Sequence, residues 1–169
     1  MTVPRRVVTG HDADGRSVVL SDGPTPNSQG IPGATFHELW STTETPASLA
    51  PAEKVEPTSR PLVTPPPAGG TVIRVVDLEA QSRSPMHRTQ SLDYGIVLGG
   101  EPTLVLDDGS QTPLAPGDVV VQRGTDHAWV NDTDEPARMA FVLVDGSFTD
   151  ELARLLPGEP QLFDRPLDR

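Results

Sequence analysis

No cysteine occurs among the 169 residues of the chain. This absence excludes disulfide bridges, thiolate metal sites and cysteine nucleophiles, so any bound metal must take nitrogen and oxygen ligands. Basic residues are scarce as well, with 13 Lys and Arg against 24 Asp and Glu and a net charge of −11. A phosphate backbone or an anionic membrane surface would repel such a chain, so neither nucleic acid nor a membrane is an expected partner.

Long apolar runs are also missing. Residues 1–10 lack the apolar stretch that a secretory signal needs, and no part of the sequence approaches the roughly 18 consecutive apolar residues of a membrane span. No glycine-rich phosphate loop follows a predicted strand and opens a helix. The sequence therefore predicts a soluble, cytoplasmic protein.

The length fits a single domain, which we expect to comprise residues 1–169. Short β-rich runs separated by turn residues indicate a sandwich or barrel. Within residues 1–41, Arg6–Thr9 and Ser17–Leu20 are predicted to form a hairpin around an Asp-Gly turn. Gly33–Ser41 alternates as a strand does, and either of its faces could point inward.

The rest of the chain divides into three parts. Residues 42–70 contain seven prolines, whose missing backbone donors exclude a long helix or central strand, so we expect a surface excursion there. Residues 147–169 form a tail with one short helix over Phe148–Leu156, capped by Thr149. Residues 71–146 form the core, with strands predicted over Thr71–Leu78, Leu92–Leu98, Thr103–Leu106, Asp118–Gln122, Ala128–Asn131 and Arg138–Val144.

Two segments of this core, residues 84–100 and 117–131, resemble the two sequence motifs of the cupins. The first cupin motif has the order His-x-His, Glu, Gly, and the residues at these positions here are His87, Thr89, Asp93 and Gly100. The second has the order Gly, Pro-x-Gly, His, Asn, and it is matched by Gly117, Gly124, His127 and Asn131, with Gln122 at the proline position. The first motif is therefore a variant, because Thr89 replaces a histidine, Asp93 replaces the glutamate and Ser82 stands where the opening glycine is expected.

The resemblance implies an all-β fold, a double-stranded β-helix or jelly-roll barrel, with extra N-terminal strands and one short C-terminal helix. It also implies a small-molecule site inside the barrel and pairing of two chains through N-terminal strands. Arg6–Ser41 supplies more β-sequence than one small barrel needs, so we expect a homodimer.

Strand alternation indicates which side chains of the motifs share a face. His87, Thr89 and Asp93 are spaced to point one way and Tyr94 the other, while His127 and Trp129 share a face. If the two faces meet, two imidazoles and a carboxylate converge, an arrangement typical of Fe(II) sites that Mn, Ni, Co or Zn could also occupy. We therefore expect His87, Asp93 and His127 to be the catalytic residues and the metal ligands, with orientation of an imidazole as the alternative role of Asp93.

Three functions are compatible with this pattern. The first is a metal-dependent enzyme that oxygenates, isomerises or decarboxylates an organic acid, a phenol or a polyketide-like molecule. The second is a metal-free isomerase or epimerase in which His87 and Asp93 act as a pair and Tyr94 as an acid. The third is a non-catalytic module that binds a small molecule. In each case Thr89 and Trp129 are expected to line the pocket, with Tyr94 and His37 as further candidates.

Overall fold

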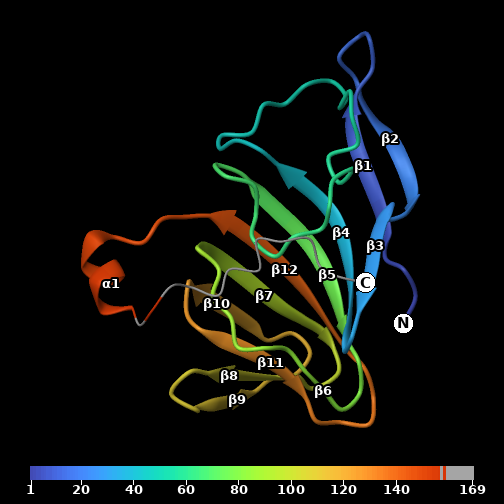
Figure 1. Cartoon of the computed structure of the whole chain (residues 1–169). Helices are drawn as coiled ribbons and strands as arrows, with labels where there is room; N and C mark the ends of the chain where they lie inside the picture. The colour runs from blue at the N-terminus through green and yellow to red at the C-terminus, as the bar shows by residue number, and fades with distance from the viewer. Residues whose placement is uncertain (157, 159–169) are drawn as a thin grey trace.

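The computed structural model describes residues 1–156 and 158, and their fold is a barrel of two facing β-sheets (Figure 1). A six-stranded sheet has the order β10-β7-β12-β5-β4-β3, and a four-stranded sheet has the order β6-β11-β8-β9. The first sheet consists of β3 (Asn27–Ile31), β4 (Ala34–Thr42), β5 (Thr71–Leu78), β7 (Ser91–Gly99), β10 (Val119–Arg123) and β12 (Ala137–Asp145). The second consists of β6 (Ser82–Arg83), β8 (Thr103–Leu106), β9 (Gln111–Pro113) and β11 (His127–Asn131).

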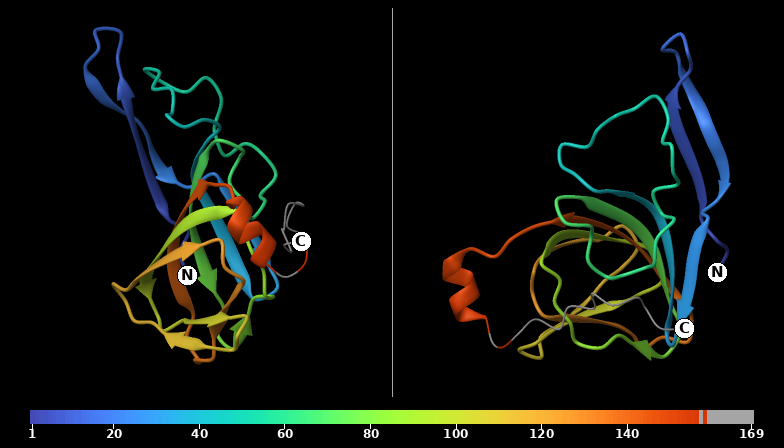
Figure 2. Two further views of the ribbon diagram at one scale, coloured as in Figure 1. Left: turned by 90° about the vertical axis from the view of Figure 1, so that its left-hand side faces the viewer. Right: turned by 45° about the horizontal axis from the view of Figure 1, so that its top comes forward.

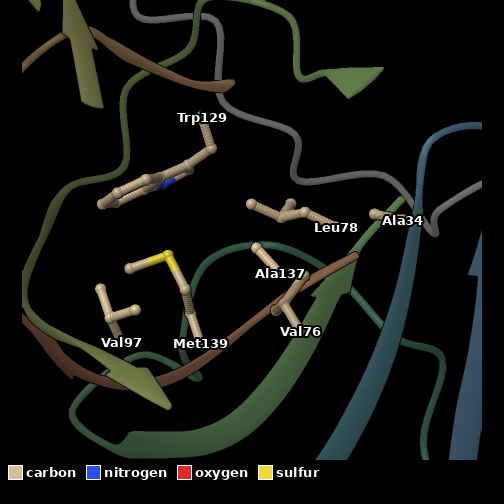
Figure 3. Close-up of a cluster of buried hydrophobic side chains, with 7 residues drawn as sticks. All are labelled: Ala34, Val76, Leu78, Val97, Trp129, Ala137 and Met139. Carbon is tan, nitrogen blue, oxygen red and sulfur yellow. The ribbon is translucent and has the colours of Figure 1, made fainter. Parts of the chain in front are cut away.

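The core lies between the two sheets (Figure 3). Trp129 on β11 faces Val97 and Met139 on the opposite sheet, and all three are almost fully buried. Val97 and Met139 alternate along their strands with more exposed neighbours, whereas both faces of β11 are buried. The alternation seen in the sequence thus fixes which side chains enter the barrel.

The predicted N-terminal hairpin is the antiparallel pair of β1 (Arg5–His11) and β2 (Ser17–Pro24). It stands away from the barrel in every view (Figures 1 and 2). Gly15 has a φ of 77°, so the turn uses the backbone conformation that glycine adopts most readily. The predicted strand over residues 33–41 is β4, which pairs antiparallel with β3, the strand before it in the chain.

The proline-rich segment forms no strand or helix between residues 43 and 70, all of which the structure describes. The sequence suggested a surface excursion, but part of the segment is buried. Leu62 is 2% exposed, Thr58 is also buried, and Arg60 reaches back to Glu38 on β4. Burial of Leu62 is favourable because it removes apolar surface from water, whereas Thr58 and Arg60 are held by Glu56 and Glu38.

One short helix, α1 (Asp150–Leu155), follows the last strand. As predicted, Thr149 caps it, its side chain accepting a hydrogen bond from the Leu152 amide. Within the described residues, no helix combines the length and the apolar character that crossing a membrane would need.

Candidate functional site

A cavity of about 180 Å³ opens between the two sheets. Most of its wall is apolar and belongs to β4, β5, β11, β12 and the loop before β4, with side chains that include Ile31, Ala34, Phe36, Val76, Leu78, Trp129, Phe141 and Leu143 (partly shown in Figure 3). Its polar residues include His87, Thr89, Asp93 and His127. A small number of polar groups in an apolar wall is the usual composition of a small-molecule site.

The two histidines of the motifs are brought together by backbone pairing. The amide of each residue donates to the carbonyl of the other over 2.9 Å, an antiparallel bridge that joins the 84–90 segment to the start of β11. The ring centroids are consequently 4.2 Å apart. Their chain neighbours Arg88 and Asp126 form a largely buried ion pair that connects the same two segments.

Each imidazole is oriented by a backbone carbonyl. Nδ1 of His87 lies 2.9 Å from the Pro85 oxygen, and Nδ1 of His127 lies 3.0 Å from the Thr125 oxygen. A carbonyl only accepts, so Nδ1 carries the hydrogen in both rings and the basic lone pair is on Nε2. The buried side-chain amide of Gln122 also contacts Nδ1 of His127, and a hydrogen on that nitrogen requires the amide to turn its oxygen, rather than its nitrogen, toward the ring.

Both imidazoles are neutral near pH 7. Burial, helped by the adjacent His87 ring, lowers the pKa of His127 to about 3. Burial also lowers the pKa of His87, against the opposing influence of the Pro85 carbonyl and Asp126. Two neutral rings with defined tautomers each keep a lone pair on Nε2 for a proton or a metal, and a pKa of about 3 makes His127 a weak base.

Asp93 lies on β7 and is held by two hydroxyls. Ser91 donates to one carboxylate oxygen over 2.6 Å, and Thr89 donates to the other over 3.3 Å. Burial raises the pKa of Asp93 to about 6, although these hydrogen bonds and Arg74 act to lower it. Within residues 1–156 and 158, no three His, Asp or Glu side chains come together in a group that could hold a metal. The expected set of His87, Asp93 and His127 therefore shares one cavity without forming a three-ligand metal site.

Two predicted pocket residues lie elsewhere. Tyr94 is 39% exposed and is not among the residues lining the cavity, because it alternates with Asp93 and faces outward. His37 is buried but faces away from the cavity, since it alternates with the lining residue Phe36. Its ring bonds to Ser28 over 2.8 Å and to Asp77 over 3.2 Å, so its position is explained by this outer network.

The sequence reasoning missed a charged group at the inner end of β4 and β5. Glu38 and Arg74 are paired across these strands, are almost fully buried and lie 3.2 Å apart. Arg74 lines the cavity together with Val76 and Leu78, with which it shares one face of β5. Its two-residue spacing from Val76 and Leu78 indicated the face that it takes, but nothing in the sequence of the strand indicated a buried partner.

Comparison with known proteins agrees with this geometry. Residues 74–144 match the family model for the cupin domain. The chain is 39% identical over 145 residues to the cupin-domain-containing oxidoreductase fogC of Aspergillus ruber, covering 83% of this chain and 71% of that protein. The chain belongs to the cupin family.

Other similarities extend over more of this cupin. Phomopsin biosynthesis cluster protein C' of Diaporthe leptostromiformis is 40% identical over 164 residues, which are 94% of this chain and 87% of the relative. The cupin domain of Schizosaccharomyces pombe Cnp3 superposes with a TM-score of 0.53 at 15% identity, over 92% of this chain and 96% of that one. At that identity the match to Cnp3 shows a common fold alone.

Proposed function

We propose that this cupin is an oxidoreductase that acts on a small organic molecule of secondary metabolism bound in the barrel cavity. The observation that carries the proposal is the meeting of two neutral imidazoles, His87 and His127, in the wall of a mostly apolar cavity. The name of the Aspergillus ruber relative supports the reaction class, and the name of the Diaporthe relative supports a biosynthetic context.

The chain's own residues supply proton transfer. Oxidation of an alcohol or a hydroquinone releases protons together with electrons, so such a site needs a base beside the reacting carbon or oxygen. The Nε2 lone pair of His127 or His87 fills this role, because the Pro85 and Thr125 carbonyls hold the hydrogen on Nδ1. Asp93 lines the same cavity and accepts a hydrogen bond from Thr89, which also lines it.

A divalent metal such as Fe, Mn, Ni, Co or Zn fits these residues only in part. The imidazoles are suitable, since a metal-bound histidine typically donates its other ring N–H to a carbonyl. The third ligand does not fit, because the Asp93 carboxylate is turned to the hydroxyls of Ser91 and Thr89. The chain's own groups therefore supply the proton transfer of the proposed reaction, and the two electrons pass to an acceptor from solution, dioxygen or a nicotinamide.

The metal-free isomerase remains the second candidate, and the exposed position of Tyr94 argues against it. That reaction needs an acid opposite the base, and Tyr94 was the residue expected to provide it. Since Tyr94 points out of the barrel, the acid would have to be Asp93, which burial keeps partly protonated near pH 6.

The test is a turnover assay on wild type and His127→Asn. Each protein is incubated with one-ring alcohols, hydroquinones and phenols in air, with and without a nicotinamide or a divalent metal, and products are identified by mass. We expect wild type to remove two hydrogens or add one oxygen to a member of the panel, and His127→Asn to be at least about 100-fold slower, the lower range of a general base's contribution.

Metal analysis of the same preparations checks the role of the imidazoles. One equivalent of tightly bound metal in wild type that is absent from His87→Ala and His127→Ala would make these side chains ligands rather than bases. Ligand binding by wild type without any mass change in the panel would make the protein a binding module.

A further inference from the structure

Arg74 is a buried cation in the wall of an apolar cavity. Its side chain is 2% exposed, and it lies on the same face of β5 as Val76 and Leu78, which line the same cavity. An isolated charge in such surroundings is costly unless other charges or hydrogen bonds compensate it. The question is whether the neighbouring groups satisfy this guanidinium.

The groups that the structure describes around Arg74 compensate its charge only in part. Glu38 is the carboxylate nearest to Arg74, at 3.2 Å, but it also faces Arg60, whose Nη2 lies 2.7 Å from the other Glu38 oxygen. One carboxylate is thus shared by two guanidinium groups. Among the described residues, Nε of Arg74 is buried and has no hydrogen-bond partner.

The other carboxylate at this end of the cavity is already engaged. Both oxygens of Asp93 accept hydrogen bonds from Ser91 and Thr89, and its interaction with Arg74 is electrostatic rather than a direct bond. Burial outweighs Glu38 and Asp93 and lowers the pKa of Arg74 to about 10. A negative group from outside the chain would therefore find an undercompensated donor facing it.

We propose that Arg74 is the anchor for a carboxylate on the small molecule that the cavity binds, so that the ligand is a one-ring organic acid or a larger acid inserted ring first. This inference rests on the proposed function for the presence of a ligand, and it adds the ligand's charge and orientation. The shape of the site agrees with it. An apolar cavity of about 150 Å³ holds a benzene ring, and this one measures about 180 Å³ with Phe36, Trp129 and Phe141 in its wall.

The overall charge of the chain makes such an anchor necessary. At a net charge of −11, the long-range field repels an organic anion rather than attracting it. Specific recognition of an acid therefore requires a local cation that water does not screen. Arg74 meets this condition better than Arg83, the other arginine in the described wall, because Arg83 is exposed.

The experiment is calorimetric binding of benzoate and of its neutral isostere benzamide at pH 7.5, with no turnover required. We expect wild type to bind benzoate at least tenfold more tightly than benzamide, which is about 1.4 kcal/mol. Arg74→Met should reduce this preference to within twofold while benzamide binding changes little, and Arg74→Lys should retain part of it. The matched control Arg83→Met should keep the full preference.

Several results would overturn the inference. Equal binding of the two probes by wild type, or failure of benzoate to bind at millimolar concentration, would show that Arg74 serves only the ion pair with Glu38. Loss of the preference in Arg83→Met and not in Arg74→Met would put the anchor at the cavity mouth. If Arg74→Met does not fold, Glu38→Gln combined with Arg74→Met removes both charges and gives the same comparison. Charge-selective binding without turnover in the oxidation panel would leave the anchor standing and reject the proposed reaction.

Discussion

At neutral pH, Asp93→Asn should gain stability relative to wild type, and this gain should be smaller in mild acid. The Asp93 carboxyl is 5% exposed, and burial raises its pKa from the ordinary 3.8 to about 6. The folded state therefore keeps a proton that the unfolded chain has already released between these two values. Ionisation of Asp93 costs stability as the pH rises through this range.

The size of the effect follows from the pKa. At about 1.4 kcal/mol per pH unit, the interval from 3.8 to about 6 corresponds to about 3 kcal/mol. Asparagine has nearly the same shape, and its amide oxygen can still accept the hydrogen bond from Ser91. The free energy of unfolding of Asp93→Asn minus that of wild type should thus increase by about 2 kcal/mol between pH 4 and pH 7, because the unfolded carboxyl is already more than half ionised at pH 4.

Urea unfolding at pH 4, 5, 6 and 7, followed by tryptophan fluorescence in the presence of EDTA, measures this difference. The chelator removes any metal that would hold the carboxylate ionised, and the titration of His127 cancels because both proteins contain it. Asp107→Asn is the matched control, since Asp107 is exposed in the turn after β8. A difference that stays within about 1 kcal/mol across the range, or that shrinks as the pH rises, would refute the reasoning, because it would mean that Arg74 and the hydroxyls fully compensate the buried charge.

Two further predictions concern the barrel's construction and assembly. Gly100 has a φ of 76°, and a Cβ there would lie 2.6 Å from the Ala137 backbone. Gly100→Ala should therefore lower the free energy of unfolding by more than about 1 kcal/mol. Gly109→Ala should cost less, because Gly109 also has a positive φ but has open space around it. We also expect a homodimer paired through the N-terminal strands, since β3 is an edge of the six-stranded sheet and the β1–β2 hairpin stands clear of the barrel; light scattering should give twice the 18.0 kDa chain mass, and a mass of 18.0 kDa at micromolar concentration would contradict it.

The fold was largely predictable because its strands carry local signals. The strands β5 and β8 begin and end at the predicted residues, and the Asp-Gly turn and the Thr149 cap are where the sequence puts them. In contrast, β3 escaped prediction because only the last of its five residues, Ile31, is β-branched and none is aromatic, so pairing with β4 is what makes it a strand.

The site was predictable where two-residue alternation along a strand shows which face a side chain takes and the cupin motifs indicate which segment that face meets. His87, Thr89, Asp93, His127 and Trp129 all line the cavity, as their spacing indicates. The sequence did not fix which face of β4 points into the barrel, because both faces carry polar side chains and an aromatic ring. For this reason His37 was expected in the pocket. The Glu38–Arg74 pair broke the rule that charged side chains lie outside, and no local pattern shows that two distant charges will be buried together.

The measurement that tests the account most directly is a long-range ¹H–¹⁵N NMR spectrum of the imidazoles. The chain contains four histidines, so the spectrum is simple, and His127→Gln identifies the signals of that ring. The account predicts that His127 carries its hydrogen on Nδ1, stays neutral from pH 7 to about pH 4 in line with a pKa of about 3, and that its Nε2 signal shifts when a small molecule fills the cavity. A His127 that titrates near pH 6.5, or carries its hydrogen on Nε2, would contradict the proposal that this cavity presents a neutral base to its substrate.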